Sequence, residues 1–361
     1  MKTFGSVLEG YKGIGPGFDT MRIVLAFAVI AWHCIPIALG SADSGKHSHA
    51  WVLWYSVLPV FFALSGFLVA GSALRLSLGK FALSRALRII PALVVDTLVT
   101  IVLIAPFFTT LSLVDFFSNI ETAKYLLNII GKIQFTLPGV FESNPYANIV
   151  NGSLWTIGPE LLCYLVMGFL IFSSWIKSSL KVAFIFILVS VYIIVAYWVA
   201  EHFELKGEGF IIHAGWKLLI AFLAGALCFL LRFRIPYSPS FFVGVVIVFV
   251  LFSLFVPAQW DNSVWIVVSM PLFVYVMAFL GLTPLPKVPF FDRGDYSYGI
   301  YLYGFPIQQA FVKIFDISDP LILFFSVVVP ITVLAVFSWH CVEKPALKLR
   351  KAFSFSAQAA R

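Results

Sequence analysis

Charged residues are scarce in this 361-residue chain: Asp, Glu, Lys and Arg make up 11% of it, whereas 61% of the residues are hydrophobic. A soluble globular domain carries about 25% charged residues and about half apolar ones. The composition therefore excludes a soluble globular protein. We attribute the net charge of +7 to loops that set membrane topology, not to nucleic-acid binding, and expect no nucleic-acid partner.

Cysteine is sparse as well, and its four copies show no paired spacing and lie in or beside apolar runs. We therefore interpret them as small core residues, not as a disulfide framework or metal ligands. The sequence contains no Gly-rich phosphate loop and no serine nucleophile elbow. It also lacks an internal repeat, and no small-residue cleavage site follows the first apolar run. We expect no bound cofactor or metal, and a single membrane domain over residues 1–361.

The chain has instead a series of apolar runs near 20 residues, the length that crosses a bilayer as a helix. The mean hydropathy of +0.99 agrees with this reading. The predicted fold is an all-α polytopic membrane protein with about ten transmembrane helices. These are expected at about 18–39, 51–73, 86–108, 152–172, 182–200, 211–231, 241–256, 264–280, 298–315 and 321–342.

Lysine and arginine set the predicted orientation. The loop that contains Arg75, Lys80 and Arg85 is basic, and so are the later loops on the same side, whereas the opposite loops hold fewer basic residues among acidic ones. The positive-inside rule then places both termini in the cytoplasm. The N-terminal segment 1–17 and the tail 343–361 are expected there. A long external loop is expected at about 109–151, with a short amphipathic helix near Tyr125.

The stretch from Phe18 to His33 is the most informative span, because it carries Asp19, Arg22 and His33 within an apolar run. Ionisable groups are costly inside a membrane helix, so three of them on one span indicate a function. Arg22 and His33 lie about three helical turns apart, on nearly the same face and roughly 16 Å from each other along the axis. The alternative is a polar helix end with one internally satisfied histidine.

Glu160 in the fourth predicted span is a second candidate. This span runs in the opposite direction to the first, so Glu160 is expected about 12 Å below the outer surface, close to the depth of His33. A carboxylate beside an imidazole fixes its tautomer and raises its basicity, as a general base near neutral pH requires. The alternative is a buried carboxylate that is bonded to a neighbouring helix.

The predicted cytoplasmic helix ends are rich in arginine. Arg85 and Arg88 are three residues apart and share a helix face. Guanidinium groups bind phosphate oxygens bidentately, so the pair predicts a phosphate-rich ligand. Ordinary positive-inside topology is an equal alternative for each of them. Tyr298, Tyr301 and Tyr303 begin the ninth span, where Tyr301 and Tyr303 lie deep enough to need hydroxyl partners.

Six motifs follow one another along the chain: Asp19-Thr-Met-Arg22 followed after ten residues by His33, Phe61–Leu68 with Ser65-Gly66, Arg85 with Arg88-Ile-Ile-Pro91, Ser153-Leu-Trp-Thr through Glu160, Asp295–Leu302, and Glu343-Lys-Pro345. Together and in this order they resemble the membrane acyltransferase-3 family, which includes bacterial O-acetyltransferases of surface polysaccharides. The likeness spans about Phe18 to Pro345.

The resemblance implies a multi-pass enzyme of the bacterial inner (cytoplasmic) membrane that uses cytoplasmic acyl-CoA, usually acetyl-CoA, as co-substrate. The acyl group would go to a hydroxyl of a cell-surface polysaccharide or lipid-linked oligosaccharide, typically across the membrane. His33 would be the general base or carry the acyl group, Glu160 would orient it, and Asp19 would fix Arg22. The residues expected to contact CoA or the acyl channel are Arg22, Arg85, Arg88, Ser65, Tyr298 and Tyr301.

Two features depart from the family pattern. Many relatives carry a histidine in the ninth helix where this chain has Tyr303-Gly304, and no C-terminal hydrolase-like domain of the kind fused to some relatives is seen. The membrane unit would then act alone or hand its product to another protein. A rival reading is a proton-coupled transporter or flippase for a sugar-lipid or an anion, with His33 and Glu160 as a relay. A membrane-bound O-acyltransferase of lipid or protein is a second rival. The acceptor, the acyl group, an acyl-enzyme step and the oligomeric state are left open.

Overall fold

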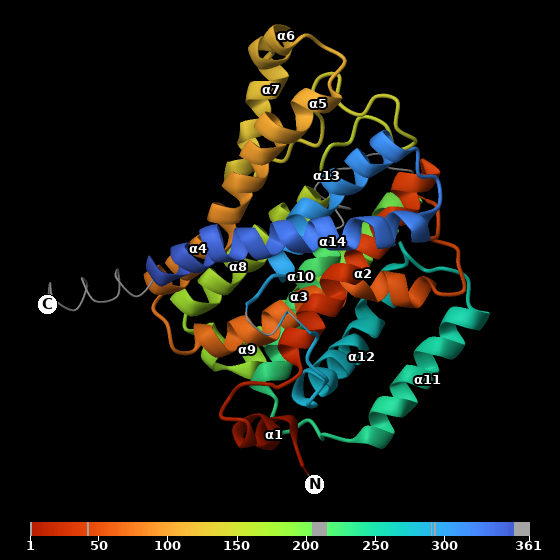
Figure 1. Cartoon of the computed structure of the whole chain (residues 1–361). Helices are drawn as coiled ribbons and strands as arrows, with labels where there is room; N and C mark the ends of the chain where they lie inside the picture. The colour runs from red at the N-terminus through yellow and green to blue at the C-terminus, as the bar shows by residue number, and fades with distance from the viewer. Residues whose placement is uncertain (1, 42, 204–214, 290, 292–293, 350–361) are drawn as a thin grey trace, which may run out of the picture. The chain divides into compact units, whose positions relative to one another are not determined.

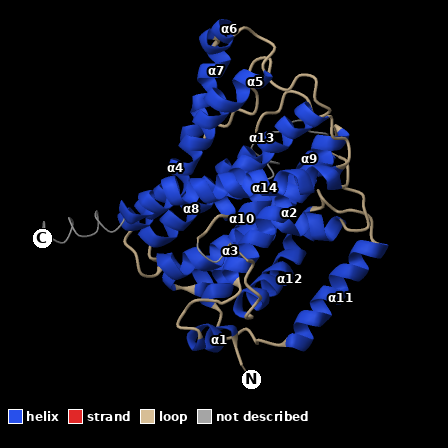
Figure 2. Cartoon of the chain, in the orientation of Figure 1, coloured by secondary structure: helices blue, strands red, loops and turns tan. Residues whose placement is uncertain are grey.

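A computed structural model describes residues 2–41, 43–203, 215–289, 291 and 294–349 of the chain. Within these residues the regular structure is helical, apart from two isolated β-bridges (Figures 1 and 2). The predicted all-α class is therefore confirmed. The α-helices are α1 (Phe4–Gly10), α2 (Phe18–Leu39), α3 (Trp51–Ala73), α4 (Leu78–Val99), α5 (Ala105–Phe108), α6 (Leu113–Ser118), α7 (Ile120–Tyr125), α8 (Ile157–Phe172), α9 (Ser179–His202), α10 (Gly215–Leu230), α11 (Pro239–Phe255), α12 (Ser263–Leu282), α13 (Ser297–Phe315) and α14 (Pro320–Ser338).

Seven helical segments among the described residues have the length and hydropathy to cross a membrane. α10 and α11 are apolar but shorter, and α13 is not one of the seven. Each of the ten predicted spans falls on a helix, while the count of ten spans and the cytoplasmic placement of both termini stay predictions. The seven segments are Phe18–Leu39, Trp51–Ala73, Leu78–Phe108, Gly152–Phe172, Ser179–His202, Ser263–Leu282 and Pro320–Leu349.

The third helix begins well before its predicted start. It was expected from Ala86, but α4 starts at Leu78 and continues through a π-helical turn at Thr100–Ile104 into α5. The first two turns contain Lys80 and Arg85, so hydropathy alone could not mark them as helical. Residues 211–214 of the sixth predicted span and residues 350–361 of the predicted tail lie outside the described residues.

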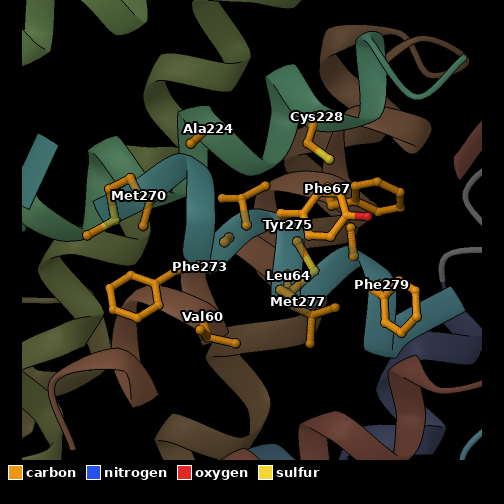
Figure 3. Packing of buried hydrophobic residues seen from close by; sticks show 14 of the residues in the cluster. Val60, Leu64, Phe67, Ala224, Cys228, Met270, Phe273, Tyr275, Met277 and Phe279 are labelled. Carbon is orange, nitrogen blue, oxygen red and sulfur yellow. The ribbon is translucent and has the colours of Figure 1, made fainter. Parts of the chain in front are cut away.

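The chain divides into two compact units, of which the first comprises residues 1–25, 46–81 and 159–287. Its core is formed by buried apolar side chains of α3, α10 and α12, part of which Figure 3 shows. Two glycines let α3 and α10 approach: a Cβ on Gly66 would lie 1.9 Å from the carbonyl oxygen of Phe222, and one on Gly225 would lie 2.0 Å from that of Ala63. Close helix packing through small residues is common in membrane proteins, and Gly66 serves it here.

The second unit comprises residues 26–45, 82–158 and 288–361. Here α13 and α14 pack closely, because a Cβ on Gly299 would lie 2.9 Å from the Cα of Ala335. The predicted external loop 109–151, which we call the cap, contains α6, α7 and a 3₁₀ turn at Leu126–Ile130. A short helix near Tyr125 is thus confirmed. Burial, and after it the Asp96 carboxylate, raise the pKa of the Tyr125 phenol well above its ordinary value, so this hydroxyl stays protonated.

Gln309 of α13 fastens the cap to this unit. The side-chain amide of Asn144 donates hydrogen bonds to the backbone oxygen of Gln309 (2.9 Å) and to its Oε1 (2.8 Å). Nε2 of Gln309 donates in turn to the backbone carbonyls of Tyr146 and Ile149, both at 2.7 Å. Gln309, which is fully buried, therefore takes part in four hydrogen bonds, three through its side-chain amide and one through its backbone oxygen. These bonds fix the end of the cap against α13.

Candidate active site

His33 lies in the second half of α2 and belongs to the second unit. Its ring packs edge-on against Phe305 of α13, with 5.2 Å between the ring centroids. Nδ1 is buried and has no hydrogen-bond partner among the described residues, although the residue as a whole is partly exposed. The described residues therefore leave Nδ1 of this imidazole without a partner. A general base that acts on a hydroxyl needs a ring nitrogen that is free to take up a proton.

Gln308 of α13 bonds to a residue of α2 on each side of His33. Its Nε2 donates to the carbonyl oxygen of Ile30 (2.8 Å) and to Sγ of Cys34 (2.9 Å). Pro36, further along α2, has no N–H to give to the preceding turn, so the helix is weakened near His33. Gln308 is fully buried, and its amide adds hydrogen bonds from α13 to the turn that contains the histidine. Sequence reasoning missed Gln308, for which the available signal was a Gln-Gln pair inside an apolar helix.

The entry to α8 is held by buried polar side chains of the same unit. The Tyr301 hydroxyl donates to the carbonyl of Ser153 (2.8 Å) and shares a hydrogen bond with the Thr156 hydroxyl (2.6 Å). The amide of Asn151 donates to Asp96 (3.3 Å) and to the carbonyl of Leu302 (3.0 Å). The expectation that Tyr301 needs a hydroxyl partner is confirmed. Gly152 lies between these anchors, and a Cβ there would meet the ring of Phe305, the ring that contacts His33.

Arg88 is paired with two carboxylates. Nη2 lies 2.9 Å from Oδ2 of Asp295, and Nη1 lies 3.3 Å from Oε2 of Glu343, whose side chain is 2% exposed. The guanidinium also lies 5.4 Å from the ring centroid of Tyr298, whose hydroxyl donates to the carbonyl of Ile89. The structure thus gives Arg88 a buried counter-ion role that the sequence did not reveal. A contact of Arg88 with CoA phosphates stays a prediction.

Glu343 connects this ion pair to the second tyrosine that was expected to need a partner. The Ser338 hydroxyl donates to Oε1 of Glu343 (3.2 Å), and the Tyr303 hydroxyl donates to Ser338 (3.1 Å). Glu343 ends a π-helical turn, Trp339–Glu343, that follows α14. The motif Glu343-Lys-Pro345 therefore contributes a buried carboxylate in addition to a helix end.

Of the remaining predicted residues, Asp19, Arg22, Ser65 and Glu160 belong to the first unit. Arg22 Nη1 lies 3.4 Å from Oδ1 of Asp19, so the expected pair is present. The Tyr164 hydroxyl donates to Oε1 of Glu160 (2.7 Å). Ser65 is partly buried on α3. Because Glu160 and His33 belong to different units, their pairing stays a prediction.

Arg85 belongs to the second unit, where its Nε donates to the Ser84 hydroxyl (3.3 Å). No group of three or more His, Cys, Asp and Glu side chains that could hold a metal ion occurs among the described residues. Cys34, Cys163 and Cys228 are buried, as core residues should be, whereas Cys341 is exposed. The core interpretation is wrong for Cys341, which belongs to the π turn Trp339–Glu343 and is exposed.

Comparison with known proteins shows the family of this chain. Residues 16–340 match a protein family that is described as an acyltransferase domain. The chain is 27% identical over 340 residues to an "O-acetyl transferase" of Shigella phage Sf6, which covers 91% of this chain and 94% of that protein. It is 28% identical over 371 residues to "Nodulation protein 10" of Rhizobium leguminosarum bv. viciae, with 95% and 96% covered. No solved structure matches.

Proposed function

Because the chain belongs to this acyltransferase-3 family and is an acyltransferase, we propose that it moves an acyl group, most simply acetyl, from acyl-CoA to a carbohydrate hydroxyl. The acceptor would be a cell-surface polysaccharide or a lipid-linked oligosaccharide. The name of the phage relative supports O-acetyl transfer. The apolar helices support a multi-pass membrane location, which we assign to a bacterial inner membrane with acyl-CoA on the cytoplasmic side.

The observation that carries this proposal is the imidazole of His33, which packs against Phe305 and has an Nδ1 without a partner among the described residues. The imidazole would take the proton of the acceptor hydroxyl while the hydroxyl oxygen attacks the thioester carbonyl of acyl-CoA. The C–S bond then breaks, and the CoA thiolate leaves and takes up a proton to become the thiol. Phe305 and Gln308 hold the ring and its helix during this step. Positioned base catalysis of this kind contributes about a hundred- to ten-thousand-fold in rate.

The donor would be held by basic side chains. Arg22, oriented by Asp19, is the first candidate for the CoA phosphates, and Arg85 is the second. Arg88 already neutralises two carboxylates, so in our proposal it supports the site more than it binds phosphate. Glu160 would orient His33, and Ser65, Tyr298 and Tyr301 would line the path of the acyl group.

The test uses purified protein in detergent or nanodiscs with radiolabelled acetyl-CoA. We expect His33→Ala to lower turnover or thioester hydrolysis by at least about a hundred-fold and to leave acetyl-CoA binding intact. Arg22→Ala should weaken acetyl-CoA binding. His47→Ala, a change of an exposed histidine, is the matched control and should behave as the wild type.

Full turnover by His33→Ala in well-folded protein would overturn the role of the histidine. If the wild type neither binds nor hydrolyses acetyl-CoA or succinyl-CoA, the acyl-CoA donor is wrong. Uptake of a sugar-lipid or an anion coupled to protons, without acyl-CoA, would then favour the transporter.

A further inference from the structure

An apolar cavity of about 290 Å³ lies within the first unit, far in sequence from His33. α10 contributes Ala224, Leu227 and Cys228 to its wall, and α12 contributes Pro271 and Tyr275. Figure 3 shows Cys228 and Tyr275 facing one another from these two helices. The Tyr275 hydroxyl donates to backbone carbonyls of Pro236 and Ser238 instead of pointing into the space. The cavity therefore offers hydrocarbon contacts and almost no hydrogen bonds.

The wall of the cavity includes residues on the surface of the first unit. Two residues in its wall, Phe241 at the start of α11 and Pro271 in the middle of α12, are exposed. α12 has the length and hydropathy of a membrane span, and α10 and α11 are apolar. Protein interiors are close-packed, and apolar spaces of this kind do not hold water well. Beside membrane-spanning helices, the molecule available to fill the space is a lipid chain.

Two arginines are next in sequence to residues that line the cavity. Leu231 and Ile235 both line it, and they flank Arg232 and Arg234 in the α10–α11 connection. Arg232 lies over the rings of Phe229 and Phe233, at 4.3 and 4.6 Å from their centroids. The guanidinium is therefore held in place before any ligand arrives.

Arg234 is the better placed of the two arginines for an anion. It is exposed, and no ion pair holds it within the described part of the chain. Arg232, in contrast, interacts with the carboxylate of Glu9, which partly offsets its charge. From Ala224 to Leu231, the residue after α10, the wall runs about 10 Å along the helix axis. The cavity is an apolar slot, and two arginines are the sequence neighbours of residues that line it.

We propose that this cavity binds one acyl chain of an anionic phospholipid, whose phosphate is held by Arg234 with help from Arg232. The apolar slot accounts for the chain, and the arginines account for a phosphate that carries net negative charge. Free phosphate would leave the slot unused, and a neutral lipid would gain little from the arginines. This lipid site is independent of acyl transfer and needs only the membrane location.

The experiment is native mass spectrometry of the full chain released from nanodiscs of phosphatidylglycerol or of phosphatidylcholine. We expect the wild type to retain one phosphatidylglycerol more tightly than phosphatidylcholine. Arg234→Gln should weaken that retention about five-fold, the effect of one basic residue near an anionic lipid surface. Arg75→Gln, which changes another exposed arginine of the same unit, is the matched control and should retain the lipid as the wild type does.

A second pair of variants tests the slot itself. Leu227→Trp places a large ring in the wall of the cavity and should abolish tight retention of the lipid. Leu180→Trp on the exposed face of α9 should not. Equal retention of both phospholipids, or retention that neither Arg234→Gln nor Leu227→Trp changes, would overturn the proposal. Replacement of the phospholipid by free phosphate or by a polyprenyl phosphate would overturn it as well.

Discussion

Arg88 holds two carboxylates at once, and one of them, Glu343, is almost completely buried. Removing one partner of a buried ion pair leaves an uncompensated charge, which costs about 3–5 kcal/mol. We therefore expect Arg88→Met to lower the free energy of unfolding by an amount of this order and to reduce the yield of folded protein. Thermal unfolding of the purified protein measures the change.

The double variant Arg88→Met/Glu343→Gln serves as the control, because it removes both charges of that pair. It should recover part of the lost stability. If Arg88→Met melts like the wild type and loses acyl-CoA binding instead, the arginine is a phosphate ligand. The ion pair would then contribute little to the free energy of unfolding.

The partners of individual polar residues could be predicted from the sequence in some cases and not in others. Tyr301 and Tyr303 could be predicted to have partners, because an unsatisfied hydroxyl in an apolar span is costly. Gln308 could not be predicted to hold the His33 helix, since its amide is uncharged and its partner Ile30 lies 278 positions earlier. The two ion pairs of Arg88 could not be predicted for the same reason. Asp295 and Glu343 are distant from Arg88 in sequence and contact it only in the fold.

Among the helices, the contact of α3 with α10 rests on two glycines. A Cβ on Gly66 or Gly225 would meet the backbone of the opposite helix at about 2 Å, and backbone cannot move aside cheaply. We expect Gly66→Ala to cost about 1–3 kcal/mol of stability, as overpacking usually does, and to lower the melting temperature in detergent.

Gly244→Ala is the matched control for that measurement. Gly244 lies in α11 of the same unit, and a Cβ there would meet nothing within 4 Å. This variant should melt at or slightly above the wild-type temperature, because alanine is the better helix former. Equal melting temperatures of the two variants would show that α3 and α10 can move apart at little cost in stability.

Helices as elements were well predicted, because apolar runs of membrane length leave the backbone few other choices. Their ends were less so. α4 starts at Leu78, because Lys80 and Arg85 interrupt the apolar run without breaking the helix. The two π turns were not predicted at all, since no residue pattern distinguishes them from ordinary helix in an apolar segment.

For the whole molecule, the distribution of lysine and arginine predicts that the cap faces outward and that both termini face the cytoplasm. We expect Lys124→Cys, in α7 of the cap, to react with an impermeant maleimide added to intact cells after removal of the outer barrier. Lys80→Cys, in the first turn of α4, should react only after the membrane is opened. Both variants are made with Cys341→Ser, because Cys341 is the exposed native cysteine among the described residues.

The opposite labelling pattern would invert the orientation, and with it the side from which acyl-CoA is drawn. Orientation lies beyond the reach of helix packing, since the same bundle could be inserted either way. The acceptor glycan cannot be predicted from the sequence for a different reason. Carbohydrate recognition depends on side chains that several elements bring together, and a single sequence does not show which hydroxyl these side chains contact.

The π turn at Trp339–Glu343 has a consequence for how relatives are compared. Such a turn holds one residue more than the α-helical turn it replaces, and each residue rotates a helix by about 100°. A relative that lost a single position here would carry its carboxylate on another side of the helix, away from Arg88. Alignments of this family should therefore be checked for one-residue gaps just before the Glu-Lys-Pro segment. A deletion there would disturb the ion pair with Arg88 more than most substitutions would.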